Sequence, residues 1–189
     1  MPTFDTPRLH LRPLGHADEA LYCRLYTDPE VMRHIATPLS AEAARAAFAR
    51  VSRLTRQDAP TLQVWVLHDR ASVADLGIVA LIGHADLPGA REIGAMLLVE
   101  GRLRGVAAAA IGAVADHVFD PGDGDGDGVG ADVHRLWTRH APGNEAAMRL
   151  MLRMGFRRQV PCGVDRAELR WRMSRERWNA GRLARNGKA

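Results

Sequence analysis

Arg102-Leu103-Arg104-Gly105-Val106-Ala107 is the stretch that decides the fold. It follows an apolar run at residues 93–99 that predicts a β-strand, and it opens an alanine-rich run at 107–115 that predicts a helix. A glycine turn between strand and helix leaves backbone N–H groups unpaired at the helix start. With the positive end of the helix dipole, they form an anion site that suits a pyrophosphate. Gly105 lets the backbone approach such a ligand. The alternative is an ordinary turn with a solvated arginine.

The bulk composition indicates a globular protein. The chain has 189 residues, which suits one domain with a hydrophobic core, and its residues are 47% hydrophobic and 25% charged. Residues 1–10 do not resemble a signal peptide, and no apolar run is long enough to span a bilayer. Cys23 and Cys162 are too few for a disulfide framework or a cysteine metal cluster. We expect a cytoplasmic protein that neither binds membranes nor holds a metal.

The charge balance is basic, with a formal net charge of +4. Such a balance can indicate nucleic-acid binding. Here, however, the arginines are spread along the chain and usually stand beside Asp or Glu. We therefore interpret the charge as solvated arginine with some preference for anionic ligands, and nucleic-acid binding is not expected as the main role.

Apolar periodicity predicts the elements before the glycine turn. Alternating apolar and polar residues predict strands, whereas apolar residues three and four apart predict helices. We expect a strand at residues 8–14, helices at 16–28, 29–35 and 40–57, and strands at 61–67, 76–84 and 92–99. The last three strands would form a meander, and Ser40 would cap the long helix.

The elements after the turn begin with a helix at residues 105–119, followed by an Asp/Gly loop at 120–130. A strand at 133–140, a helix at 145–154 and strands at 156–160 and 166–173 complete the pattern, and Gly155 ends the second helix. This order predicts a mixed sheet with helices on its faces, an α+β or α/β domain.

The Asp/Gly loop contains half of a calcium-binding pattern. Asp123-x-Asp125-x-Asp127-Gly128 copies the first half of an EF-hand loop. The twelfth position is His134 rather than a bidentate glutamate, and no helix pair frames the loop. We therefore expect a solvated connection and no metal site.

Several short motifs fall on the predicted elements in order. They are Thr6 to Pro13, Tyr26 to Met32, Glu92-Ile93-Gly94, Arg102-x-x-Gly105-x-Ala107, Pro142-Gly143-Asn144-Glu145-Ala146 with Gly155-Phe156, and Met173 to Trp178. With this set the chain resembles the GCN5-related N-acetyltransferase (GNAT) superfamily. Within it, the chain resembles the RimJ/RimL-type ribosomal-protein N-terminal acetyltransferase branch. The resemblance covers residues 6–178.

The resemblance implies an α+β (mixed α/β) fold with a central mixed, mostly antiparallel sheet of six to seven strands flanked by about four helices. One acyltransferase domain is expected at residues 1–178, with a basic disordered tail at 179–189. The implied activity is acyl-CoA-dependent N-acyl transfer, which moves an acetyl group from acetyl-CoA, the co-substrate, to a primary amine by direct attack in a ternary complex. The acceptor could be a protein N-terminal α-amine or a small molecule, and a homodimer is compatible with the sequence.

The resemblance also implies which residues bind coenzyme A. The pyrophosphate would lie on the glycine turn and the helix start, formed by Arg102, Leu103, Arg104, Gly105, Val106, Ala107 and Ala108. The pantetheine arm would pair with the backbone of Met96, Leu97 and Leu98, which requires two neighbouring strands to splay apart, for example at a bulge in residues 99–101. Asn144 would contact the cofactor arm, although asparagine also suits a helix cap at this position.

The chemistry needs a base for the amine and stabilisation of an oxyanion. Glu92 heads the strand where relatives often carry a carboxylate base, so we expect it to be catalytic, the alternative being a surface strand residue. His84, His68 and Asp86 are further candidates. Many relatives carry a tyrosine where this chain has Met151, and the branch often has a serine where it has Ala147. These departures leave a second hypothesis open: a catalytically weak or inactive CoA-binding regulatory module.

Overall fold

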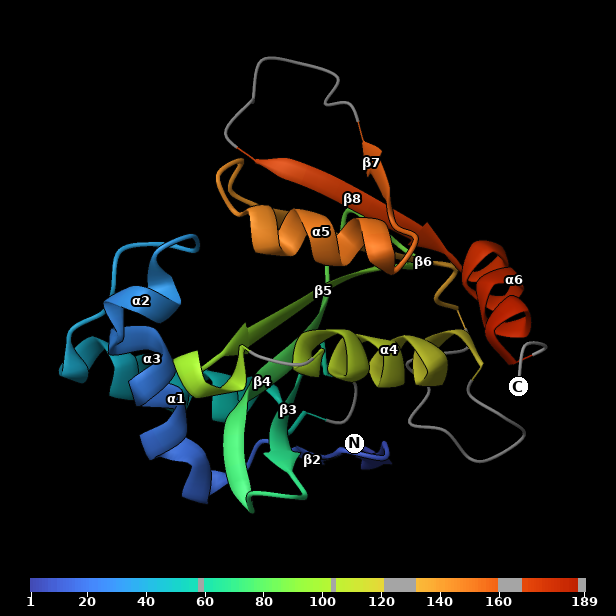
Figure 1. Cartoon of the computed structure of the whole chain (residues 1–189). Helices are drawn as coiled ribbons and strands as arrows, with labels where there is room; N and C mark the ends of the chain where they lie inside the picture. The colour runs from blue at the N-terminus through green and yellow to red at the C-terminus, as the bar shows by residue number, and fades with distance from the viewer. Residues whose placement is uncertain (58–59, 103–104, 121–131, 160–167, 187–189) are drawn as a thin grey trace.

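The computed structural model describes residues 1–57, 60–102, 105–120, 132–159 and 168–186. One sheet of eight described strands runs through the molecule in the order β1-β2-β3-β4-β5-β6-β8-β7 (Figure 1). The strands are β1 (Phe4–Asp5), β2 (Leu9–Pro13), β3 (Leu62–Asp69), β4 (Ala74–Gly83), β5 (Ala90–Leu97), β6 (Arg135–His140), β7 (Arg157–Gln159) and β8 (Leu169–Ser174). All neighbouring strands are antiparallel except β5 and β6, which are parallel.

Helices cover both faces of this sheet. They are α1 (Glu19–Thr27), α2 (Pro29–Met32), α3 (Ala41–Leu54), α4 (Val106–Phe119), α5 (Glu145–Arg153) and α6 (Arg175–Asn186), with 3₁₀ turns η1 (His16–Asp18) and η2 (Val99–Gly101). Helices α1, α2 and α3 gather at one end of the molecule, whereas α5 lies above β5 and α4 below it in the view of Figure 1. The mixed α+β architecture is thus confirmed.

Two hydrophobic cores follow from the alternation of side chains along the strands. Trp65 and Leu67 of β3 face one core, which also contains Val114 of α4 and Met151 of α5. Their strand neighbours face the second core, together with Phe48 of α3 and other residues of α1 and α2. Helices α4 and α5 therefore pack on one face of the sheet, and α1 and α3 on the other.

Local capping explains where three helices begin. The Ser40 hydroxyl accepts a hydrogen bond from the Ala43 N–H at 3.1 Å, as expected for the cap of α3. The Asp28 carboxylate accepts from the Glu30 N–H at 2.7 Å, and Pro29 occupies the first helical position of α2. Asn144 caps α5 in the same way. These starts depend on neighbouring residues and were predictable from the sequence.

The structure corrects two expectations. The described residues form eight strands and six α-helices rather than six to seven and about four. The missed strand β1 is only two residues long, too short to show a period, and it is held by pairing of Phe4 with Leu11. Residues 179–186, expected in a disordered tail, continue α6. The Trp178 indole N–H donates to Asp116 at 2.7 Å, and Arg182 pairs with Asp120, so contacts with α4 stabilise α6.

The one-domain organisation of residues 1–178 stays a prediction. The EF-hand-like residues 123–128 lie outside the described residues. Within the described residues, no helix combines the length and the apolar character needed to cross a membrane.

Candidate active site

Strands β5 and β6 separate in the middle of the sheet. They pair over three positions only, Ala90 with Arg135, Arg91 with Leu136, and Glu92 with Trp137. Beyond these pairs β5 continues along β4, and β6 continues along β8. The β6-facing edge of residues 93–97 therefore has no strand partner in the described part of the chain. The splay was expected at residues 99–101, but that segment forms η2, and the strands part earlier.

A pocket of about 610 Å³ lies beside this free edge. Its walls come from four places in the chain: α2 and the residues that follow it, Ala95–Leu97 of β5, the first turn of α4, and α5 with the residues just before it. In Figure 1 the corresponding ribbons surround the end of β5. The pocket thus joins the unpaired strand edge to the N-terminus of α4.

Gly105 sets the geometry of that helix start. It has a φ of 80°, in the left-handed region that favours glycine, and a Cβ at this position would meet no atom within 4 Å. The first backbone bond of α4 runs from the Ala109 N–H to the Gly105 carbonyl at 2.9 Å. The amides of residues 106–108 precede this bond and have no intrahelical acceptor. Open space, free amides and a first turn of Val and Ala side chains fit a pyrophosphate.

Most of the residues expected to bind CoA lie together in this pocket. Those that line it are Met96, Leu97, Arg102, Gly105, Val106, Ala107, Ala108 and Asn144. Leu103 and Arg104 lie outside the described residues.

Leu98 differs from Met96 and Leu97, with which it was expected to pair with the pantetheine arm. Its side chain is buried in the second core, and its N–H donates to the Leu76 carbonyl at 2.9 Å. Its carbonyl accepts from the Gly101 N–H at 2.9 Å, within η2. Leu98 does not line the pocket, and both of its backbone groups are bonded within the protein.

Asn144 caps helix α5, which was the alternative to a cofactor contact for this residue. Its Oδ1 accepts from the Ala147 N–H at 3.1 Å. The side-chain NH₂ group remains a donor at the pocket wall. The two roles are therefore compatible, and the cofactor contact stays a prediction.

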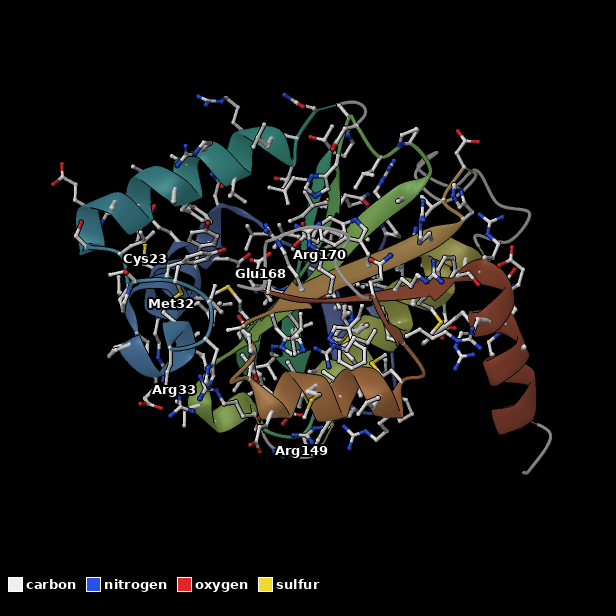
Figure 2. The ribbon with its side chains drawn as sticks, turned by 90° about the horizontal axis from the view of Figure 1, so that it is seen from above. Cys23, Met32, Arg33, Arg149, Glu168 and Arg170 are labelled. Atoms are coloured by element: carbon white, nitrogen blue, oxygen red, sulfur yellow. The ribbon has the colours of Figure 1, made fainter. Side chains whose placement is uncertain are left out.

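Basic side chains at the pocket mouth were missed by the sequence analysis. Arg33 and Arg149 line the pocket from the end of α2 and from α5. Both project on the same side of the molecule (Figure 2). Arg149 and Arg153 stand four residues apart on α5, so their shared face could have been found from helical spacing. Arg102 also donates to the Glu30 carbonyl, which ties the α4 entrance to α2.

Glu92 lies at the other side of the splay. Ile93 faces the core beneath α4 and α5, so the Glu92 side chain points to the opposite face of the sheet. Its Oε1 accepts from the Arg139 Nε–H at 3.0 Å, and its Oε2 lies 3.0 Å from the His84 Nε2. Glu92 does not line the 610 Å³ pocket but stands where β5 and β6 separate.

Arg139 extends this cluster toward β8. Its Nη1 donates to a Glu168 carboxylate oxygen at 3.1 Å. Burial alone would lower the pKa of Arg139, but its hydrogen bonds to Glu92 and Glu168 raise it above the ordinary value. Arg139 therefore stays charged and pairs with both Glu92 and Glu168.

Of the remaining catalytic candidates, only His84 contacts Glu92 within the described residues. His84 joins the Glu92 cluster, with its ring centroid 5.3 Å from that of Trp137. His68 pairs with Asp75 at 2.9 Å, and Asp75 in turn contacts Arg12, so His68 belongs to a structural network. Asp86 is exposed in the turn before β5. Met151 is buried in the first core, and Ala147 lines the pocket, so neither position supplies a hydroxyl.

A larger hollow of about 890 Å³ lies between the end of α5, β8 and α6. It contains neither the splayed edge of β5 nor the α4 helix start. Its size therefore does not make it a better candidate than the pocket at Gly105.

The comparisons with known proteins agree with this fold. A family model described as an acetyltransferase (GNAT) domain matches residues 8–157. No curated protein matches the chain in sequence. Among solved structures, an acetyltransferase from Agrobacterium tumefaciens str. C58 is 22% identical with a TM-score of 0.71, over 92% of this chain and 94% of that chain.

Two similar structures contain coenzyme A. Spermidine N-acetyltransferase from Vibrio cholerae, in complex with CoA and spermine, is 17% identical with a TM-score of 0.71, over 92% of this chain and 99% of its own. RimL, a ribosomal L7/L12 alpha-N-protein acetyltransferase in complex with CoA, is 12% identical with a TM-score of 0.72, over 92% and 98%. These likenesses show a shared fold. Because the family model spans most of the chain, the protein belongs to the GNAT acetyltransferase domain family.

Proposed function

We propose that the protein is an N-acetyltransferase that moves an acetyl group from acetyl-CoA to a primary amine. The supporting observation is the position of Glu92. It stands where β5 and β6 part, on the face of the sheet opposite α4 and α5, whereas the pocket beside the free β5 edge leads to the α4 amides. One side of the opening is therefore suited to an anionic cofactor, and the other to an amine.

The residues proposed to hold CoA follow from the pocket. The amides at Val106, Ala107 and Ala108 would bind the pyrophosphate, with Arg102, Leu103, Arg104 and Gly105 forming the turn. The free backbone edge at Met96 and Leu97 would pair with the pantetheine arm, and the Asn144 amide would donate to it. Leu98 is left out because its backbone groups are already bonded. Acetyl-CoA would supply the acyl group as an activated thioester.

We propose direct attack by the amine rather than an acyl-enzyme. Cys23 lies on α1 and does not line the pocket, and burial raises the pKa of its thiol. A raised thiol pKa lowers the fraction of nucleophilic thiolate at neutral pH. Glu92 would instead take part in removing the proton of the acceptor amine.

The charges near Glu92 favour an acceptor with acidic groups. Trp137, which pairs with Glu92, pairs on its other side with Arg172, and Arg172 pairs with Arg157. Paired residues share a face of the sheet. Arg157, Arg170 and Arg172 are all exposed. In Figure 2 Glu168 and Arg170 lie on the side of β8 away from α5.

This basic face would repel a polyamine and attract a carboxylate-bearing acceptor. We therefore propose a protein N-terminal α-amine followed by acidic residues, or an acidic small amine, as the acceptor. The RimJ/RimL-type resemblance agrees with an N-terminal α-amine. The cytoplasmic location and the homodimer stay predictions.

The test is acetyl-CoA turnover, followed by thiol release, with a panel that contains acidic and basic peptides with free N-termini, amino acids and spermidine. Thiol release with at least one amine is expected. CoA binding in calorimetry without turnover of any amine would instead favour the second candidate, a CoA-binding regulatory module. The absence of a hydroxyl at Met151 and Ala147 is the observation that favours this second candidate.

A further inference from the structure

We infer that His84, rather than Glu92, accepts the proton of the acceptor amine, and that Glu92 is the positioning residue that orients His84. This inference rests on the proposed function and assigns the base within the same site. It is carried by the arrangement of three side chains: His84, which directly follows β4, Glu92 of β5 and Arg139 of β6.

Glu92 is poorly placed to take a proton itself. One carboxylate oxygen accepts from the Arg139 Nε–H and the other contacts the His84 Nε2, each at 3.0 Å. Both carboxylate oxygens are therefore already in contact with protein groups. Its side chain is also only 12% exposed. An incoming amine would have to displace a bonded neighbour to reach it.

The contact with Glu92 determines the tautomer of His84. A carboxylate without a proton only accepts hydrogen bonds, so an imidazole with a single N–H makes this contact with its hydrogen on Nε2. The other ring nitrogen, Nδ1, then has a free lone pair. No group of the described residues bonds Nδ1. A neutral imidazole with a free nitrogen is the side chain best suited to accept protons near neutral pH.

The position of His84 fits this role. Its side chain is 32% exposed, against 12% for Glu92, so it is the more accessible member of the pair. Its ring packs 5.3 Å from that of Trp137, the residue at the point where β5 and β6 separate. The charged group in contact with it is Glu92. The next charged groups are Arg139, which bonds Glu92 and Glu168, Arg170, which lies over the Trp137 ring, and Arg91, which lies beside Gly83.

The ammonium form of the acceptor gives one proton to His84 Nδ1, and the imidazolium later releases that proton to solvent. The freed nitrogen lone pair forms the amide bond to the acetyl carbon, and the carbon–sulfur bond breaks with its electron pair going to sulfur. The second proton of the amine nitrogen goes to that sulfur. The products are the acetylated amine, free CoA thiol and one proton.

The first test measures the tautomer of His84 in the protein without ligands. Nitrogen-15 NMR of the imidazole side chains, assigned with the His84→Gln variant, should show hydrogen on Nε2 and a bare Nδ1. In Glu92→Leu this preference should be lost, because the acceptor for Nε2–H is gone. A spectrum with hydrogen on Nδ1 in the wild-type protein would overturn the inference.

The second test is a pH–rate profile with the peptide amine that turns over fastest in the acceptor panel. His84→Gln keeps a donor for Glu92 but has no base, so kcat should fall about 10²- to 10⁴-fold near pH 7. The defect should shrink as pH rises toward the ordinary α-amine pKa of about 8, because the amine then loses its proton without help. Added imidazole should partly restore the rate of His84→Ala.

His68→Gln is the matched control, because His68 also pairs with a carboxylate, Asp75 at 2.9 Å, and is 29% exposed. Its profile should match the wild type. A wild-type profile in His84→Gln would overturn the inference and leave the proposed function intact. If the wild-type enzyme acetylates no amine although CoA binds, the proposed function fails, and the assignment of His84 fails with it.

Discussion

Glu92 of β5 stands directly opposite Trp137 of β6, and these two residues form the last pair that joins the parallel strands. After this pair each strand follows a different neighbour, β4 for β5 and β8 for β6. The sheet therefore opens at Glu92, with the His84 and Arg139 contacts on one face and helices α4 and α5 on the other.

The Glu92→Gln variant should be slow but should bind CoA normally. A neutral amide pairs less strongly than a carboxylate with the Arg139 guanidinium and with the imidazolium that His84 becomes. We therefore expect kcat to fall about 10- to 100-fold. The CoA dissociation constant, measured by calorimetry, should change less than about twofold, because Glu92 does not line the CoA pocket and distant substitutions act independently. Glu42→Gln, on the exposed surface of α3, is the control and should behave as wild type. An unaltered rate in Glu92→Gln would remove Glu92 from the proton path.

Two substitutions of Gly105 should separate backbone strain from charge. Gly105→Glu places a carboxylate against the anion site, and we expect CoA binding to become undetectable in calorimetry. Gly105→Ala meets open space but must adopt a φ of 80°, which costs about 1–2 kcal/mol, so binding should weaken but persist. Equal CoA affinities for Gly105→Glu and the wild type would place the pyrophosphate elsewhere.

Asn144 offers a test of capping against cofactor contact. Asn144→Ala should lower the free energy of unfolding by about 0.5–2 kcal/mol, because the Ala147 N–H loses its acceptor. Asn144→Ser retains a cap but lacks the amide donor, so its stability should match the wild type while its CoA affinity falls. Chemical denaturation and calorimetry on both variants give the answer. Full CoA affinity in both would limit Asn144 to capping.

Asp18 should make the fold sensitive to acid. Burial alone would raise the pKa of Asp18, but hydrogen bonds from Arg12 and the Gly15 N–H lower it below the ordinary 3.8. A lowered folded-state pKa stabilises the fold above about pH 4, and this stabilisation is lost as pH falls through the folded value. Asp18→Asn should therefore destabilise the protein by about 1–3 kcal/mol at pH 7 and show a flatter pH dependence below 4 in urea unfolding. The exposed Asp86→Asn serves as control and should leave both unchanged.

The acceptor preference should depend on the exposed arginines of β8. Reversing charge with Arg170→Glu and Arg172→Glu together should raise KM for an acidic N-terminal peptide about tenfold, and lower it for spermidine. The effect should weaken in high salt, because exposed charges are screened. Arg45→Glu makes the same kind of charge change on helix α3, away from β8, and should not alter the preference. Unchanged KM values for both acceptors in the double variant would exclude these arginines from acceptor choice.

The local elements of this protein follow from its sequence. The β3–β4–β5 meander, the caps at Asp28 and Ser40, and the glycine at the start of α4 depend on residues close in the chain. Strand alternation, capping and the left-handed conformation of Gly105 are short-range effects, which is why most of the CoA-binding positions could be identified before the structure.

The long-range arrangement was decided by the tertiary structure. The separation of β5 from β6 depends on which neighbour each strand follows, and β1 and α6 depend on pairing with β2 and on contacts with α4. The sequence marked Glu92 and His84 separately, but their contact, and that of Glu92 with Arg139 across 47 positions, exists only in the folded chain. The bond between Glu92 and Arg139 has no local pattern in the sequence, because the folded sheet, not the spacing along the chain, brings these side chains within 3.0 Å.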